Sequence, residues 1–436
     1  MRVGVVLLAA SLAVGVNAHP VRLVRPPAAP LSAVARLGHA IFFDASLSGS
    51  GRLSCASCHS PAHAYGPPNS LSVMRGGLRA VPSLMYLERQ PSFTIGPDGG
   101  EAEAATPVPI TAAQIAHAVK VAQLAPSSPA LVPQGGLFWD GRADTLQAQA
   151  TGPLFDPHEM NAESVTRVAA RLRAAHYAPA FRQLFGAAVV RDARALVAEA
   201  MFAVARYQIE SPSFHPYSSK YDAWLEGRAR FTAAESRGYR AFTDPHGANC
   251  AACHLVQPTA DGLPPLLTDH QFEALGVPRN PAIAANRDPS FHDLGLCGPV
   301  RRDLRGAHVD CGLFLTPTLR NVATRHAFFH NGAYHTLAQV LDFYNVRDVQ
   351  SARVYPRDRS GRLHRYDDLP AAYRTNIDRV DAPLNRKAGE RPAMNAAQER
   401  DIIAFLRTLT DGYAVSPSSA RAAASRTGPA SSAARP

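Results

Sequence analysis

The chain has 436 residues, of which 46% are hydrophobic and 8% aromatic, which is long enough for two folded domains. Its formal net charge of +10 falls to +6 without Arg2 and the three arginines after residue 420. This mild excess, with no basic run interleaved with aromatic residues, argues against a protein that binds nucleic acid.

Both ends of the chain differ in composition from the rest. Residues 1–18 place Arg2 before an apolar run and end in a small-residue cleavage pattern at Ala18, as in a secretory signal peptide. The run is too short to span a membrane and no later segment is as apolar, so we expect an exported, periplasmic protein without a membrane span. Residues 414–436 are rich in Ser, Ala, Pro and Arg, which predicts a disordered tail.

Two short motifs, SCASCH (54–59) and NCAACH (249–254), share the spacing C-x-x-C-H, which is typical of c-type haem attachment. In that chemistry the two thiols bond to the vinyl groups on one porphyrin edge, and the next residue brings an imidazole to the iron. A zinc site would need a second Cys/His pair near each motif, and a redox dithiol would not need the histidine. We therefore expect two covalently bound haem c groups, attached through Cys55, Cys58, Cys250 and Cys253, with His59 and His254 as proximal iron ligands.

The segments before the two motifs repeat at an offset of 200 residues. The matched pairs are Ser32 with Thr232, Gly38 with Gly238, Phe42 with Phe242, and Asp44 with Asp244. Each segment reads as a helix that opens on Ser or Thr and contains an internal glycine. Such a glycine costs about 1 kcal/mol relative to alanine, so it usually marks the close approach of another backbone, as where the terminal helices of a class I cytochrome c domain cross.

The remaining periodicity is also helical. Residues 162–185, 193–209 and 399–409 carry apolar residues at helical spacing, and no sustained alternation suggests a large sheet. We expect a mainly α fold with two class I cytochrome c-like haem domains packed side by side. Their predicted ranges are 31–210 and 216–412.

The two cysteines outside the motifs are Cys297 and Cys311. In an exported protein we expect them to form a disulfide. Closing this loop would stabilise the folded protein by about 3 kcal/mol. Two buried thiols are the alternative.

The stretch LAQVLDFYN (337–345) predicts an amphipathic helix, which Thr336 and Gln339 open as a capping box. Its apolar face includes Tyr344. Periodicity alone leaves two interpretations of this residue: a packed core tyrosine whose hydroxyl is satisfied by a neighbour, or a phenolate that binds a metal.

Beyond the haem motifs, the chain resembles the bacterial di-haem cytochrome c peroxidases, and among them the MauG-type members. The resemblance rests on FFDxxLS (42–48), SCASCHxPA (54–62), FWDGRADTLQAQATGPLFDPHEM (138–160), TPTLRNV (316–322), FFHNGAYHTLAQVLDFYN (328–345) and DIIAFLRTL (401–409). It implies that the N-terminal haem reacts with hydrogen peroxide and that the C-terminal haem relays electrons to it.

The same resemblance suggests three catalytic residues. Glu159 would be the distal acid–base that moves a proton between the two peroxide oxygens, Gln149 would hold peroxide, and Trp139 would carry electrons between the haems. Taken alone, Trp139 reads as packing against a turn and Glu159 as a carboxylate at a helix start.

On the N-terminal haem, the family position for a removable distal histidine holds Arg75. His63 follows His59 by only four residues and is expected to stay on the proximal side, and nothing favours Met74 or Met85 as a ligand. We therefore expect an open, five-coordinate haem that needs no reductive activation.

A second departure concerns the calcium ion that usually lies between the domains of this family. Its asparagine ligand is replaced by Ala80, and Arg325 and Ala327 stand where backbone carbonyls bind the ion. We expect calcium to be absent, with the Arg325 guanidinium partly replacing its charge.

The second ligand of the C-terminal haem is methionine in many relatives. Here Met394 is the sole methionine between His254 and the tail, and it precedes the closing helix, away from the ligand position. Fourteen residues after His330, that position holds Tyr344, as in MauG-type proteins. A phenolate favours oxidised iron and would lower the potential of this haem.

The sequence thus predicts a periplasmic di-haem peroxidase in which 31–210 is the peroxidatic domain and 216–412 the electron-transfer domain. The external partner would be a small cytochrome c or cupredoxin that donates electrons, or a protein substrate that is oxidised as in MauG. A non-catalytic di-haem electron-transfer cytochrome c is the alternative.

Overall fold

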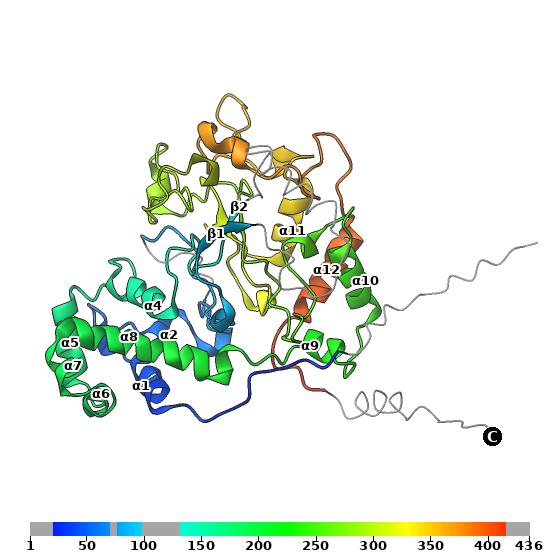
Figure 1. Ribbon diagram of the computed structural model, residues 1–436. Coiled ribbons are helices and arrows are strands. Elements are labelled where there is room, and N and C mark those ends of the chain that lie inside the picture. Colours follow the sequence, from blue (N-terminus) through cyan, green and yellow to red (C-terminus); the bar gives the residue numbers. More distant parts are fainter. Residues whose placement is uncertain (1–20, 70–75, 98–130, 416–436) are drawn as a thin grey trace, which may run out of the picture.

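A computed structural model describes residues 21–69, 76–97 and 131–415 (Figure 1). The predicted signal peptide and residues 416–436 of the predicted tail lie outside the described residues. The described part is mostly helical, as expected. Its helices are α1 (Ala33–Phe42), α2 (Cys55–Cys58), α4 (Leu146–Phe155), α5 (Val165–Ala174), α6 (Ala178–Phe185), α7 (Ala187–Arg191), α8 (Ala193–Glu210), α9 (Lys220–Leu225), α10 (Ala233–Thr243), α11 (Leu337–Val346) and α12 (Ala396–Arg407).

The repeated glycines lie where helices cross, which confirms that expectation. A Cβ on Gly38 of α1 would lie 1.8 Å from the Ala203 carbonyl oxygen in α8. A Cβ on Gly238 of α10 would lie 1.9 Å from the Asp401 carbonyl oxygen in α12. Both distances are far below contact, so only glycine lets each pair of helix backbones approach this closely.

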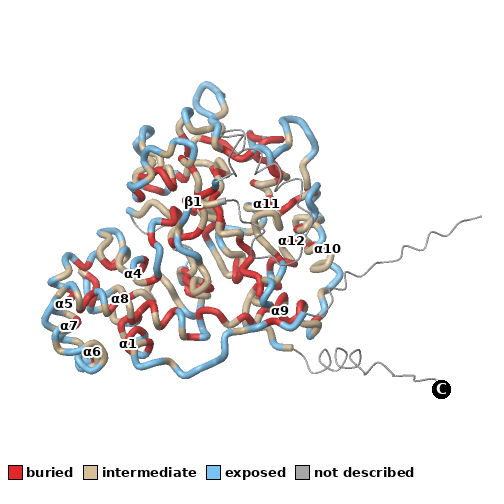
Figure 2. Tube along the Cα trace, in the orientation of Figure 1, coloured by how far each residue is buried: buried red, intermediate tan, exposed pale blue. Residues whose placement is uncertain are grey.

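Each crossing belongs to its own apolar core. Phe42 and Val204 bury their side chains in a cluster drawn from α1, α5, α6 and α8, and Phe242 and Phe405 do so in a cluster around α10, α11 and α12. In Figure 1 the two groups of helices lie apart, with loops of residues 260–390 above and between them, and Figure 2 shows buried segments running through both. The domain limits 31–210 and 216–412 remain a prediction.

The helical run predicted over 162–185 is interrupted. Helix α5 ends at Ala174 and α6 begins at Ala178, with Pro179 in the first turn of α6. Proline lacks a backbone N–H and is tolerated in a first turn but not inside a helix, which explains the break. The closing helix α12 begins three residues earlier than predicted because Asn395 and Gln398 form a capping box.

Strands contribute little to the fold. β1 (Thr94–Pro97) pairs antiparallel with β2 (Leu131–Gln134), with Thr94 opposite Gln134. β3 (Phe272–Glu273) pairs antiparallel with β4 (Phe314–Leu315), and the Leu315 N–H donates to the Trp139 carbonyl at 2.9 Å.

An extended segment, residues 21–31, precedes α1 and runs along α9 of the other helix group (Figure 1). The Val21 N–H donates to the Leu225 carbonyl at 2.9 Å, and the Val24 N–H donates to the Gly262 carbonyl at 2.8 Å. Leu23 is buried in the second core, and Arg25 forms an ion pair with Glu226.

Among residues 21–69, 76–97 and 131–415, no helix is both long and apolar enough to cross a lipid bilayer.

Candidate functional site

The first haem motif folds as the short helix α2, which Ser54 and Ser57 cap. The His59 N–H donates to the Cys55 carbonyl at 2.9 Å, and its ring Nδ1 lies 3.0 Å from the Tyr65 carbonyl oxygen. Because a carbonyl only accepts, Nδ1 carries the proton and Nε2 keeps a free lone pair. Burial lowers the pKa of His59 to about 4, which keeps the imidazole neutral at physiological pH.

The second motif repeats this arrangement on a single 3-10 turn, Cys250–Ala252, entered through left-handed Asn249 with a φ of 48°. The His254 ring Nδ1 lies 2.8 Å from the Leu267 carbonyl oxygen. Burial lowers the pKa of His254 to about 4 as well, so this imidazole also presents a neutral Nε2.

A mostly apolar cavity of about 310 Å³ adjoins the second motif and extends towards the first group of helices. His254 and Tyr344 lie on its wall, together with Trp139, Gln149 and Arg325. The cavity therefore brings together residues that the sequence places in both predicted domains.

Tyr344 lines this cavity from α11, whose Thr336/Gln339 capping box is present as predicted. Its hydroxyl has no hydrogen-bond partner among the described residues, whereas the Tyr221 hydroxyl donates to the Val256 carbonyl at 2.6 Å. Burial raises the pKa of Tyr344, and the charges of Cys253 and Cys250 raise it further. A phenolate would form here only beside a cation, and the nearby cysteines belong to the haem motif.

Met394 also lines this cavity, although the sequence suggested that it lay away from the ligand position. Its backbone is tied to the residue next to Tyr344: the Asn345 side-chain amide donates to the Met394 carbonyl at 2.8 Å, and the Met394 N–H donates back at 2.9 Å. Two candidate donors, a phenol and a thioether, therefore border the pocket of His254.

These residues fit a haem c group. Burial raises the pKa of Cys55 and of Cys250 to about 12 each, which suits uncharged thioether anchors and disfavours a thiolate metal site. Each motif histidine offers one neutral nitrogen, and the second motif opens on an apolar cavity with an unpartnered phenol on its wall.

Glu159 lies beside the first motif, just after α4. Its negative charge raises the pKa of the Cys58 thiol, so the two groups lie within the range of an electrostatic interaction. Burial, helped by the charge of Asp156, raises the pKa of Glu159 to about 7, and Arg142 acts in the opposite direction. A carboxyl group with this pKa can both accept and return a proton near neutral pH.

Gln149 and Trp139 lie on the cavity wall, which Glu159 does not line. The buried Gln149 side chain makes no hydrogen bond to a described residue, so its amide is available to a ligand. The Trp139 indole N–H donates to the Ala80 carbonyl at 2.8 Å, and its ring packs against Ala80, Phe314 and Ala327.

A buried ion cluster beside Trp139 was not predicted from the sequence. Arg79 donates two hydrogen bonds to Asp293, at 2.7 and 2.8 Å, and approaches Asp140 at 2.7 Å. The Asp140 carboxylate is fully buried and also pairs with Arg142 at 2.8 Å. The sequence signal was limited to Asp140 directly after Trp139 and Arg142 two residues later, because Arg79 and Asp293 lie far from them along the chain.

The region of the expected calcium site contains buried Ala80, whose N–H donates to the His330 carbonyl at 2.7 Å. Arg325 donates to the Val81 carbonyl at 3.2 Å, and its charge lowers the pKa of His59. Burial lowers the pKa of Arg325 itself to about 10, so the guanidinium stays charged at neutral pH.

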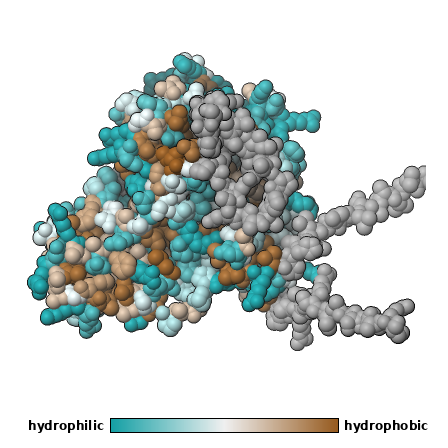
Figure 3. Space-filling model, in the orientation of Figure 1, coloured by the Kyte–Doolittle hydropathy of each residue, from teal (hydrophilic) through white to brown (hydrophobic). Residues whose placement is uncertain are grey.

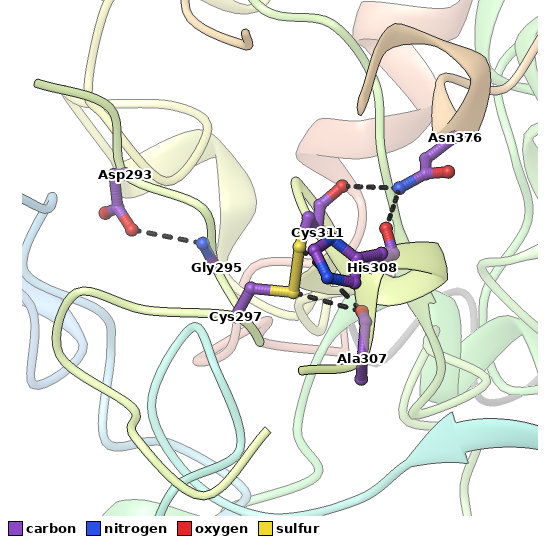
Figure 4. Close-up of a disulfide and its surroundings, with 7 residues drawn as sticks. All are labelled: Asp293, Gly295, Cys297, Ala307, His308, Cys311 and Asn376. Atoms are coloured by element: carbon purple, nitrogen blue, oxygen red, sulfur yellow. Dashed lines mark hydrogen bonds between the residues drawn. A yellow bond between two sulfur atoms is a disulfide. The ribbon is translucent and has the colours of Figure 1, made fainter. Parts of the chain in front are cut away.

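Cys297 and Cys311 form a disulfide (Figure 4), as predicted. The bond closes a loop whose base is held by the Gly312 N–H donating to the Leu294 carbonyl at 2.8 Å. Asp293, the partner of Arg79, lies directly before this loop, and its carboxylate accepts from the Gly295 N–H at 3.1 Å. The disulfide thus anchors the chain that supplies Asp293 to the ion cluster.

The expected distal side of the first haem is only partly visible, because Met74 and Arg75 lie outside the described residues. His63 is held locally, with Nδ1 lying 3.1 Å from the Ser60 hydroxyl. Met85 is buried in the first core, which gives it a packing role.

Comparison with known proteins gives consistent matches. The family model of the di-haem cytochrome c peroxidases matches residues 32–230. The methylamine utilization protein MauG of Paracoccus denitrificans (strain Pd 1222) is 30% identical over 394 residues, which cover 87% of this chain and 89% of that protein. A cytochrome c551 peroxidase of Nitrosomonas europaea is 27% identical over 354 residues, covering 79% of this chain and 81% of the relative.

A solved structure agrees with these relatives. The crystal structure of the diheme peroxidase BthA from Burkholderia thailandensis E264 has 35% sequence identity and a TM-score of 0.74, and the match covers 91% of this chain and 94% of that chain. The chain therefore belongs to the di-haem cytochrome c peroxidase family that includes MauG, and it is an oxidoreductase of that type.

Proposed function

We propose that this protein is a periplasmic di-haem c peroxidase of MauG type, with each haem in a class I cytochrome c-like domain. It reduces hydrogen peroxide at the N-terminal haem, with electrons drawn through the C-terminal haem. The observation that carries the proposal is Glu159, a carboxyl group with a pKa raised to about 7 that lies beside the first haem motif.

Each haem supplies an iron that changes oxidation state, and the chain supplies the proton chemistry and the positioning. Glu159 takes a proton from one peroxide oxygen and returns it to the departing one, which makes that oxygen a better leaving group. The Gln149 amide, which has no partner among the described residues, holds peroxide by hydrogen bonds.

Electrons reach this site by way of Trp139, whose ring packs on residues of both predicted domains. Its N–H bonds to a carbonyl, which cannot accept a proton, so the indole keeps its proton while electrons pass. At the far end, Tyr344 would hold the iron of the C-terminal haem as its second ligand, and a phenolate there would lower the potential of that haem.

The external partner is a small cytochrome c or cupredoxin, or a protein side chain that is oxidised as in MauG. A non-catalytic electron-transfer cytochrome is the alternative function. Met394 favours it, because a thioether ligand would suit such a cytochrome.

Titration of the holoprotein with hydrogen peroxide, followed by optical spectroscopy, tests the proposal. We expect rapid bleaching of the haem absorption at one equivalent of peroxide. Spectra that stay unchanged would leave the electron-transfer cytochrome as the better interpretation.

A further inference from the structure

A second concave surface, of about 630 Å³, lies in the loops between α11 and α12 and has no role in the proposed chemistry. Six permanently charged cations line it: Arg362, Arg365, Arg374, Arg379, Arg386 and Lys387. We call this surface the basic pocket.

The charge of the basic pocket is not neutralised by the described residues. Asp348 is its one carboxylate, and it is already engaged by Arg347 at 2.6 Å and by Arg365 at 2.7 Å. The other five cations form no ion pair with a described residue; Arg374 and Arg386, for example, reach only backbone carbonyls.

Other acidic residues lie on the same loops but do not line the basic pocket. Asp368, Asp378 and Asp381 line the cavity instead, and Asp367 accepts from the Arg279 N–H at 3.0 Å. Asp358 pairs with His364 at 2.9 Å, and Glu390 accepts from the backbone N–H of Lys387 at 2.9 Å. The positive charge is therefore presented outwards, and Figure 3 shows hydrophilic side chains over the end of the molecule where Figure 1 draws these loops.

The basic pocket shares a wall with the cavity that holds His254 and Tyr344. Leu384 lines both spaces. Residues 381–383 and 368–369 line the cavity, while their chain neighbours 385–388 and 362–366 line the basic pocket. Asp378 of the cavity and Arg379 of the basic pocket are neighbours in the same way, so the charged surface adjoins the C-terminal haem site along these chain segments.

From this juxtaposition we infer that the basic pocket is the docking surface for an acidic redox protein that donates electrons to the C-terminal haem. The inference rests on the proposed function. Hydrogen peroxide needs two electrons and two protons to give two molecules of water, so two one-electron donors must dock in each turnover. Complementary charge speeds such encounters and is screened by salt.

The test uses one donor in two charge states: reduced basic cytochrome c, and the same protein with its lysines succinylated, which makes it acidic. With wild-type holoprotein and peroxide, we expect the acidic form to be oxidised at least tenfold faster at low ionic strength, with the advantage lost in 0.5 M salt, where the screening length is about 4 Å.

The test variant is Arg362→Glu combined with Lys387→Glu. Both residues are exposed, and neither side chain forms an ion pair with a described residue. We expect at least a tenfold loss of kcat/KM for the acidic donor and no loss for the basic donor. The control Arg194→Glu reverses an exposed charge at the start of α8 and should leave both rates unchanged.

The reaction with peroxide in the absence of donor separates this inference from the proposed function. If the wild type bleaches with peroxide but the double variant oxidises the acidic donor at the wild-type rate, the docking surface is wrong. A comparable loss per reversed charge in Arg194→Glu would overturn it too, since the effect would then reflect total charge. An altered haem spectrum in the double variant would assign these cations to the haem carboxylates instead.

Discussion

The Tyr344 side chain is half-buried on the cavity wall, and its hydroxyl forms no hydrogen bond with a described residue, so it is available to a ligand in the cavity. We expect Tyr344→Phe to change the optical and EPR spectra of the C-terminal haem and to raise its reduction potential, because an anionic ligand is lost.

Met394→Leu is the matched control on the same cavity wall, since it keeps the volume and removes the thioether. It should leave both measurements unchanged. The opposite pattern, with a silent Tyr344→Phe and an altered Met394→Leu, would give the ligand role to the thioether.

The pKa of Glu159 predicts how the rate of the peroxide reaction depends on pH. The group must first accept a proton, so its deprotonated form is active, and its pKa is about 7. The bimolecular rate with peroxide should therefore rise with pH and level off above about pH 7. Glu159→Gln should remove this step and lower the rate by roughly 10²- to 10⁴-fold, as measured by stopped-flow absorbance.

Asp156→Asn tests whether the pH dependence of the rate arises from the titration of Glu159, and it leaves Glu159 itself unchanged. The Asp156 charge helps to raise the pKa of Glu159, so its removal should move the step to lower pH. The asparagine keeps the oxygen that accepts from the His158 N–H at 2.8 Å, which preserves the local turn. A profile that did not move would assign the step to another group.

At the scale of elements, the two helix crossings depend on a missing side chain. Gly238→Ala would force a Cβ to within 1.9 Å of the Asp401 carbonyl, and α10 and α12 would have to separate. We expect the free energy of unfolding to fall by about 3 kcal/mol, measured by denaturant titration of the holoprotein. Gly306→Ala, whose Cβ meets nothing within 4 Å, should change it by less than about 0.5 kcal/mol.

These crossings were predictable because their signal is local. Ser32 and Thr232 cap helices α1 and α10. The internal glycine of each helix predicts a close contact with another helix but does not show which helix that is. The break between α5 and α6 was missed because Pro179 interrupts a run whose apolar periodicity continues on both sides.

Over the whole molecule, the two C-x-x-C-H motifs could be recognised in the sequence because their spacing is fixed within five residues, and haem attachment at these residues stays a prediction. The ion cluster and the basic pocket were not evident. Arg79 and Asp293 are 214 residues apart, and no local pattern encodes which loops will meet. Met394 reaches the cavity because its backbone N–H bonds to the Asn345 side chain. Counting residues from His330 could not reveal this contact.

The contact between the two helix groups supports a prediction about calcium. Arg325 donates to the Val81 carbonyl and remains charged in the region where the family resemblance led us to look for the ion. Washing with chelator should leave the peroxide reaction and the haem spectra unchanged, and metal analysis should find no stoichiometric calcium. Arg325→Met should slow electron transfer between the haems, since the positive charge at the interface is lost; a calcium content of one per chain would contradict this account.

The extended segment 21–31 also bears on the order in which the protein is built. This segment precedes the first core in the sequence, yet the Val21 and Val24 N–H groups donate to the carbonyls of Leu225 and Gly262, which follow about 200 residues later. Because the partners of this segment belong to the second helix group, it can reach its final position only after those parts have folded, and its docking therefore reports that the second core has formed.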